Sequence, residues 1–255
     1  MIKLIKYDLR RNANLLLAVM TVLILAELVL VFWSSGTLEA RMGFAFVFFI
    51  LAVAIFIRHN LNVFYYNIYS VSRRLLPVNT LSYVWASLVY GLLNNLVLLL
   101  VGAGFGLHWL NKFGENFVYK ADGKFGNVFL TLSVYGWAEL ILGFIFSLVF
   151  GYLFLYMIIA LARGITKKGV FWVGFLLFLI LSYAIDWVDN FLFAQRSSQM
   201  FNMVNFHFEP TNARFRYDPT TINMSSVGSI VFHILLCIVF LFVIKWCVEK
   251  RIEAK

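Results

Sequence analysis

The segment LLLAVMTVLILAELVLVFW, residues 15–33, decides the fold class of this chain. Its only charged residue is Glu27, and its length matches the roughly 20 apolar residues that a helix needs to cross a bilayer core. The basic start MIKLIKYDLRR precedes it, as in a signal peptide. However, the segment exceeds the roughly 7–15 residues of a signal-peptide hydrophobic region, and no small-residue cleavage site follows cleanly. We therefore expect an uncleaved transmembrane helix.

The rest of the chain has the same apolar character. Hydrophobic residues make up 62% and charged residues 13% of its 255 residues, and the mean hydropathy is +0.87. Soluble domains carry about 25% charged residues, and membrane β-barrels show alternating segments of about 10 residues rather than continuous apolar runs. The composition therefore predicts an all-α polytopic membrane protein. Six spans are expected, near residues 13–33, 42–58, 82–105, 138–162, 169–186 and 227–246.

The distribution of basic residues predicts the orientation of these spans. With both termini in the cytoplasm, about two thirds of the 21 Lys and Arg residues fall on the inner side of the membrane. Such an excess on short cytoplasmic loops is the usual signature of membrane topology. It also explains the net charge of +9 without a nucleic-acid partner. We therefore expect a multi-pass protein with both ends inside.

The first residues have a pattern of their own. Ile2, Ile5 and Leu9 fall on one helical face, and the basic residues between them fall on the other. This pattern predicts a short amphipathic helix over 1–12 that lies in the inner interface, ahead of a single transmembrane domain over 13–255. The alternative is a frayed, charged N-terminus.

The segment 59–81 is expected to be a cytoplasmic loop between the second and third spans. Apolar and aromatic residues recur in it at helical spacing as far as Val71, and Pro77 then prevents the helix from continuing. The pattern predicts a separate amphipathic helix that presents aromatic and basic groups to the cytoplasm. Such a helix can dock into a groove of a soluble partner, or it can lie flat on the bilayer. The loop chemistry leaves both interpretations open. Asn79 or Thr80 is expected to cap the third span.

Three features together resemble the permease subunits of the ABC-2 family of ATP-driven transporters. They are the amphipathic start MIKLIKYDLRR, the six spans with both ends inside, and LLPVNT at 75–80 just before a span. The resemblance is strongest to small bacterial subunits that export peptides or confer immunity to them. It implies a subunit of the bacterial cytoplasmic membrane that exports a hydrophobic or amphipathic substrate, such as a peptide toxin or antimicrobial.

The resemblance also implies partners. A separate P-loop ATPase would bind ATP and Mg, and a second permease subunit, identical or related, would complete the transporter. The loop 59–81 would then carry the coupling helix that sits on the ATPase. The coupling residues implied in this way are Phe64, Tyr65, Tyr66, Ile68, Tyr69, Arg73, Arg74 and Pro77. The short basic loop RGITKKG, residues 163–169, would be a second contact or a plain positive-inside anchor.

The chain offers no catalytic machinery of its own. The P-loop motif G-x-x-x-x-G-K-[ST] does not occur in it. Its four histidines are scattered and show no metal-ligand spacing, so we predict a non-catalytic subunit without metal or bound cofactor.

Four polar residues within the expected spans are candidates for a translocation path: Glu27, Asn94, Asn95 and Glu139. Acids inside a membrane are costly and therefore often functional. The two acids would lie in the outer leaflet and attract the cationic side of a substrate, or they would be near-interface acids, paired with Arg41 or hydrated. The asparagines would line the path or form hydrogen bonds between helices. His233 is more simply read as a buried imidazole.

Between the last two spans, VNFHFEPTNARFRYD at 204–218 alternates around a turn and predicts a short extracellular β-hairpin. Two other classes of protein remain as alternatives for the whole chain. An ion-coupled secondary transporter would need paired ionisable residues at mid-membrane and inverted repeats. A membrane enzyme would need a nucleophile or a metal cluster at one depth.

Overall fold

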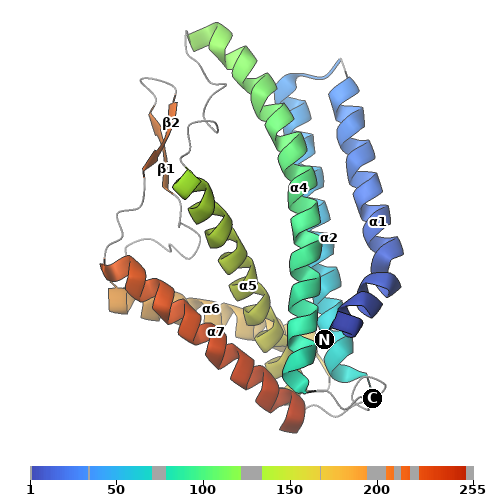
Figure 1. The fold of residues 1–255 in the computed structure, drawn as a ribbon, viewed down its shortest axis with the longest axis vertical. Coiled ribbons are helices and arrows are strands. Elements are labelled where there is room, and N and C mark those ends of the chain that lie inside the picture. Colours follow the sequence, from blue (N-terminus) through green and yellow to red (C-terminus); the bar gives the residue numbers. More distant parts are fainter. Residues whose placement is uncertain are drawn as a thin grey trace.

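The computed structural model describes residues 2–33, 35–70, 79–121, 134–166, 168–193, 205–209, 214–218 and 224–250. Its helices are α1 (Ile2–Phe32), α2 (Leu38–Tyr69), α4 (Thr80–Ala121), α5 (Val134–Ile165), α6 (Val170–Phe193) and α7 (Met224–Lys250), and its strands are β1 (Asn205–Glu209) and β2 (Arg214–Asp218) (Figure 1). All six helices are long and apolar enough to cross a membrane. The prediction of a helical chain with six candidate spans is confirmed.

Each helix extends beyond the span that hydropathy predicts. The longest, α4, has 42 residues, which is about 63 Å at 1.5 Å per residue and about twice a bilayer core. Local polar groups set several of the helix ends. The Thr37 hydroxyl accepts from the Ala40 N–H at the start of α2, and Asn79 Oδ1 accepts from the Leu81 N–H, 3.2 Å away, at the start of α4. Asn79 is thus one of the two caps that the sequence predicts.

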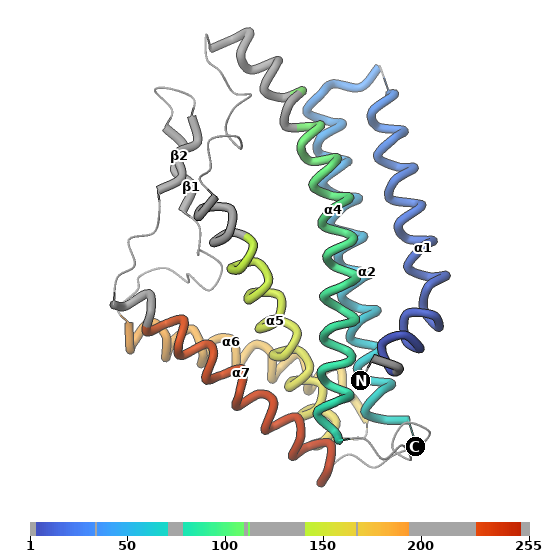
Figure 2. Tube along the Cα trace, in the orientation of Figure 1, coloured from blue at the N-terminus to red at the C-terminus, as the bar shows by residue number. Residues whose placement is uncertain are grey.

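The helices form two groups that meet at one end of the molecule. Helices α1, α2 and α4 pack together, α5 packs with α6 and α7, and the two groups diverge toward the other end (Figures 1 and 2). The largest buried cluster lies where they meet and includes Phe64 and Ile68 of α2, Val84 and Leu88 of α4, Tyr156 of α5 and Ile244 of α7. The Ile2 end of α1 and the Lys250 end of α7 are at this same end.

We call this end the basic end, because Arg10 and Arg11 of α1, Arg163 of α5 and Lys250 of α7 lie there. A tight connection between α5 and α6 also lies there. Gly169 has φ 75°, in the left-handed region that glycine adopts without strain, and its carbonyl accepts from the Trp172 and Val173 N–H groups. Two spans can therefore be joined by a very short loop at this point.

The structure has no separate helix over 1–12, because α1 is a single helix from Ile2 to Phe32 that bends near its start (Figure 2). A position of its first residues in the inner membrane interface remains a prediction. Leu4 packs on Tyr83 and Ala86 of α4. The fully buried Asp8 carboxylate accepts a hydrogen bond of 3.1 Å from Asn67 of α2. No Pro or Gly separates these residues from the first span, so the helix continues, and its inner face packs on protein.

The prediction of a separate helix after residue 58 is also wrong. Helix α2 runs through this region and ends only at Tyr69. Phe64 and Ile68 of this pattern are buried against other helices, because they continue the buried stripe of α2. Residues 71–78, with Arg73, Arg74 and Pro77, lie outside the described residues.

A two-stranded antiparallel sheet lies between α6 and α7, as the alternating pattern at 204–218 predicts. Strands β1 and β2 pair from Asn205 opposite Asp218 to Glu209 opposite Arg214. Phe206 is therefore opposite Tyr217, and Phe208 is opposite Phe215. The membrane side on which this hairpin lies remains an expectation from the basic-residue distribution.

Candidate functional site

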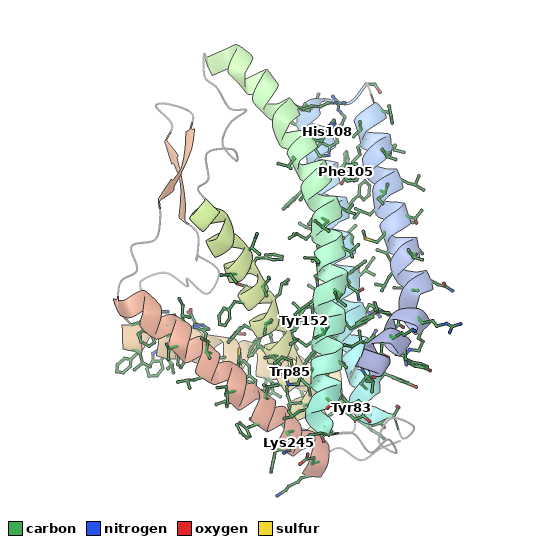
Figure 3. All side chains as sticks on the ribbon, in the orientation of Figure 1. Tyr83, Trp85, Phe105, His108, Tyr152 and Lys245 are labelled. Atoms are coloured by element: carbon green, nitrogen blue, oxygen red, sulfur yellow. The ribbon has the colours of Figure 1, made fainter. Side chains whose placement is uncertain are left out.

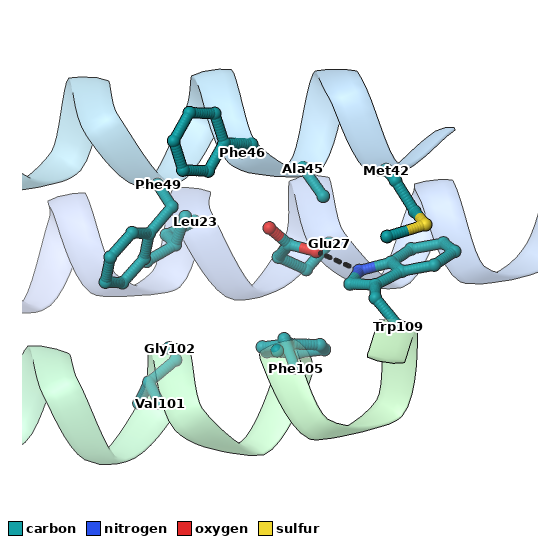
Figure 4. A pocket seen from close by; sticks show the side chains of 11 residues that line it. Leu23, Glu27, Met42, Ala45, Phe46, Phe49, Val101, Gly102, Phe105 and Trp109 are labelled. Carbon is teal, nitrogen blue, oxygen red and sulfur yellow. Dashed lines mark hydrogen bonds between the residues drawn. The ribbon is translucent and has the colours of Figure 1, made fainter. Parts of the chain in front are cut away.

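Glu27 is a buried acid inside the α1–α2–α4 group. Its residue surface is only 3% exposed, and Trp109 Nε1 of α4 donates a hydrogen bond of 3.0 Å to its Oε2 atom (Figure 4). The sequence left open a pairing with Arg41, but the hydrogen-bond partner is the Trp109 indole. A buried carboxylate needs such a donor, because an unsatisfied one loses its hydration without compensation.

A small cavity adjoins this carboxylate. Its volume is about 200 Å³, and its other lining residues are apolar and come from α1, α2 and α4: Leu23, Met42, Ala45, Phe46, Phe49, Val101, Gly102, Phe105 and Gly106, with Trp109 at one end (Figure 4). Typical small-molecule sites measure about 300–1,000 Å³. The cavity can thus receive a side chain or a short acyl segment beside the acid, but not a whole peptide.

This pocket lies away from the basic end. Figure 3 shows Phe105 and His108 toward the opposite end of the molecule from Tyr83 and Lys245, with Tyr152 between them. Phe105 belongs to the pocket wall. Glu27 is therefore in the half of the helical array that the sequence analysis assigns to the outer leaflet.

The two asparagines of α4 have different surroundings. Asn95 is buried, and its amide donates to the Gly91 carbonyl at 2.9 Å and to the Tyr152 hydroxyl of α5. Asn94 is half-buried. Asn95 thus joins the two helix groups, which is the interhelical bond that the sequence analysis offered as an alternative to a role in a path.

The α2 residues expected to contact an ATPase fall into two groups, one buried in the core and one at the surface. Phe64 is 0% exposed and stacks on Tyr156 of α5, with ring centroids 3.9 Å apart. Ile68 is buried in the same cluster. Tyr66 is 38% exposed. Phe64 and Ile68 therefore cannot contact a soluble partner without a rearrangement of the core.

Three tyrosines at the end of α2 bind arginines of this chain. Arg163 donates a hydrogen bond to the Tyr65 hydroxyl, and its guanidinium carbon lies 5.1 and 5.0 Å from the ring centroids of Tyr65 and Tyr69. The Arg11 guanidinium carbon lies 4.0 Å from the Tyr66 ring centroid. Such cation–π contacts are worth about 0.5–2 kcal/mol each. We call these five residues the arginine–tyrosine junction; it joins α2 to α1 and α5.

The structure does not place the side chains of four further candidates. Glu139 lies on α5, but its side chain is outside the described part of the structure. Arg73, Arg74 and Pro77 lie entirely outside the described residues. Their predicted roles remain predictions.

Sequence reasoning missed a polar cluster between α6 and α7. It ended the fifth span at residue 186, whereas α6 continues to Phe193 and carries Asp189 into the helical array. Ser229 Oγ of α7 donates to Asp189 Oδ1 over 2.9 Å, and His233 lies one turn further along α7. A signal was present, because Ser182, Asp186 and Asp189 recur at intervals of four and three residues on α6.

In comparisons with protein-family models, curated proteins and solved structures, nothing matches this chain. The likeness to ABC-2 permeases therefore rests on topology and on the short segments quoted above, and function has to be argued from the site.

Proposed function

We propose that this chain is the membrane-spanning subunit of an ATP-driven exporter of the ABC-2 type. It moves a hydrophobic or amphipathic substrate, such as a peptide, out of a bacterial cell. The observation that carries the proposal is the arginine–tyrosine junction at the basic end. There the end of α2 and the end of α5, which lead into the two segments expected to face an ATPase, are bound to each other through Arg163.

This arrangement suits the transmission of force. The two helix groups touch at the basic end and diverge toward the other end (Figure 2). A push on the end of α2 would therefore act on both groups through the Arg163 contact with Tyr65 and Tyr69. Because the chain has no P-loop motif, the ATP and Mg that supply this push belong to a separate ATPase. A second permease subunit completes the transporter.

The docking role belongs to the exposed part of the junction. Tyr66 is the most exposed of the four aromatic residues at the end of α2, which are Phe64, Tyr65, Tyr66 and Tyr69. It precedes the segment that contains Arg73 and Arg74. Phe64 and Ile68 support the docking surface from within the core. Glu27 then belongs to the outer part of the path, where the apolar cavity beside it receives one apolar group of the substrate at a time.

The test is purification from the native host in mild detergent, with identification of the proteins that accompany the chain. Tyr66→Ala should lower the amount of P-loop ATPase that co-purifies with the chain, because it removes the exposed ring and its contact with Arg11. The matched control is Phe46→Ala, which removes an exposed ring of the same helix far from the basic end. A transport-competent preparation without any ATPase would contradict the proposal.

One observation favours a second candidate, an ion-coupled secondary transporter. Asp189, Ser229 and His233 form a buried hydrogen-bonded cluster between two spans, and acids and histidines in such positions often carry protons. Proteoliposomes distinguish the two mechanisms. Uptake driven by a pH gradient without ATP, and lost in Asp189→Asn, would support the secondary transporter. Uptake that needs both the ATPase and ATP would support the exporter.

A further inference from the structure

A second cavity lies between α5, α6 and α7, in the helix group that does not contain Glu27. Its volume is about 390 Å³, within the range of about 300–1,000 Å³ that is typical of small-molecule sites. Three phenyl rings and three ionisable side chains line it: Phe150, Phe154, Phe178, Asp186, Asp189 and His233. An apolar cavity with a few convergent polar groups is the usual form of a ligand site.

Hydrogen bonds fix how the polar groups face this cavity. His233 is 5% exposed, and its Nδ1 atom lies 2.8 Å from the Ser229 carbonyl oxygen, which can only accept. Nδ1 therefore carries a proton, and in the neutral form of the ring Nε2 carries a lone pair. In the part of the chain that the structure describes, Nε2 has no hydrogen-bond partner. This nitrogen of a cavity-lining residue is thus available to a ligand.

The acids supply further acceptors. Asp189 is 8% exposed and receives one hydrogen bond, from the Ser229 hydroxyl to Oδ1. Asp186 precedes it by three residues on the same face of α6 and also lines the cavity. Among the described residues, no Lys or Arg side chain forms an ion pair with either carboxylate. The described part of the cavity wall therefore presents the acceptors of two acids, with no Lys or Arg among its lining residues.

These acceptors select the ligand. A positively charged group with N–H donors satisfies both the carboxylates and the free His233 nitrogen, and charged hydrogen bonds are the strong ones. The phenyl rings favour an apolar body and also attract a cation through their faces. A metal ion fits less well, because the described residues hold no group of three His, Cys, Asp or Glu side chains placed to bind one.

We propose that the cavity between α5, α6 and α7 binds a protonated organic amine with an apolar or aromatic body. The ammonium group lies at Asp189, with Asp186 and His233 on the same cavity wall, and the body lies against Phe150, Phe154 and Phe178. This site does not depend on how transport is powered, because it is formed by residues of one chain.

The test uses the purified full-length chain in nanodiscs of phosphatidylcholine, a lipid without net charge. The probe is 4-fluorophenethylamine, which is protonated at neutral pH, and binding is followed by ¹⁹F NMR. The neutral analogue 4-fluorophenethyl alcohol has nearly the same size and ring. We expect saturable binding of the amine. The alcohol should bind at least about tenfold more weakly, because loss of one charged hydrogen bond lowers the binding constant by about that factor.

Two variants locate the site. Asp189→Asn should weaken amine binding about tenfold. Asp186→Asn should weaken amine binding about threefold or more. This substitution breaks no hydrogen bond found in the structure, so it replaces Asp189→Asn in the test if that variant does not fold. Glu39→Gln, which removes an exposed acid on α2, is the matched control and should bind like the unmodified chain. Equal binding of amine and alcohol, no binding of the amine, or unchanged affinity in the folded Asp variants would each overturn the proposal.

Discussion

Replacement of Phe64 by alanine tests whether this residue docks a partner protein or belongs to the core. The sequence pattern assigns Phe64 to an exposed coupling helix, whereas the structure buries it completely and stacks it on Tyr156. Tyr66, two residues later on the same helix, is 38% exposed. We expect Phe64→Ala to lower the stability of the isolated chain strongly, and Tyr66→Ala to lower it less, by about 0.5–2 kcal/mol, through loss of the contact with Arg11.

The size of the effect follows from the burial. Buried Phe→Ala replacements in soluble proteins cost about 3–5 kcal/mol, of which part is transfer from water and part is the cavity left behind. The loss of a stacked aromatic pair is included, at about 0.5–1.5 kcal/mol. Spans that separate within a membrane meet lipid rather than water, so the transfer part is smaller there. We therefore expect the lower end of the range, about 3 kcal/mol.

The measurement is reversible unfolding of the purified chain in mixed micelles, followed by tryptophan fluorescence. Phe64→Leu is a control, because it keeps most of the buried volume and should cost roughly half as much or less. If Phe64→Ala were as stable as Tyr66→Ala and instead released the ATPase from the complex, the side chain would act by docking. The assignment of Phe64 to the core would then be refuted.

Two further predictions use the same unfolding assay, and a third compares ATP hydrolysis with transport. Gly91→Ala should cost about 1–3 kcal/mol, because its Cβ would overlap the buried Asn60 amide and lie 2.6 Å from its Cγ; Gly104→Ala, on the same helix with no atom within 4 Å of its Cβ, should be neutral or stabilising. Trp109→Phe should cost about 1–3 kcal/mol, since it leaves Glu27 buried without its donor, and Glu27→Leu in that background should recover part of the loss. Arg163→Lys should uncouple ATP hydrolysis from transport before it affects folding, because a lysine cannot contact both tyrosine rings and the Tyr65 hydroxyl in the same way; unchanged coupling would contradict the role of the junction.

The number and position of the helices could be predicted from sequence because lipid solvation acts on each span separately. A run such as 15–33 has to be helical in a membrane whatever its neighbours are, since its backbone groups find no water. The hairpin at 205–218 could be predicted for a similar reason, because alternation and a turn are local features. Helix ends could not, since hydropathy marks the lipid-facing length and α4 continues well beyond it.

The partners of polar side chains could not be predicted, because they depend on which helices meet. Tyr65 has the same aromatic character whether it faces an ATPase or Arg163 of its own chain. Glu27 was singled out as an acid within a span, but its burial and its Trp109 partner, 82 residues away in sequence, were not predicted. Asp189 was missed because the apolar window ended three residues before it, although its spacing from Asp186 and Ser182 placed all three on one helix face.

The two proposals can be tested together, because the α5–α6–α7 cavity and the arginine–tyrosine junction belong to different parts of the chain. If the chain binds the amine and also holds an ATPase, the acids of α6 lie on the path of a cationic substrate that ATP drives. If it binds the amine and works without an ATPase, the same acids with His233 favour exchange of the amine for protons. If the chain holds an ATPase but binds no amine, the exposed Asp186 has no partner among the described residues that explains it. Helix α6, on which it lies, has no buried residue in its most apolar segment. Because an acid facing lipid costs up to about 2.5–3.5 kcal/mol, α6 would then have to be covered by the second permease subunit.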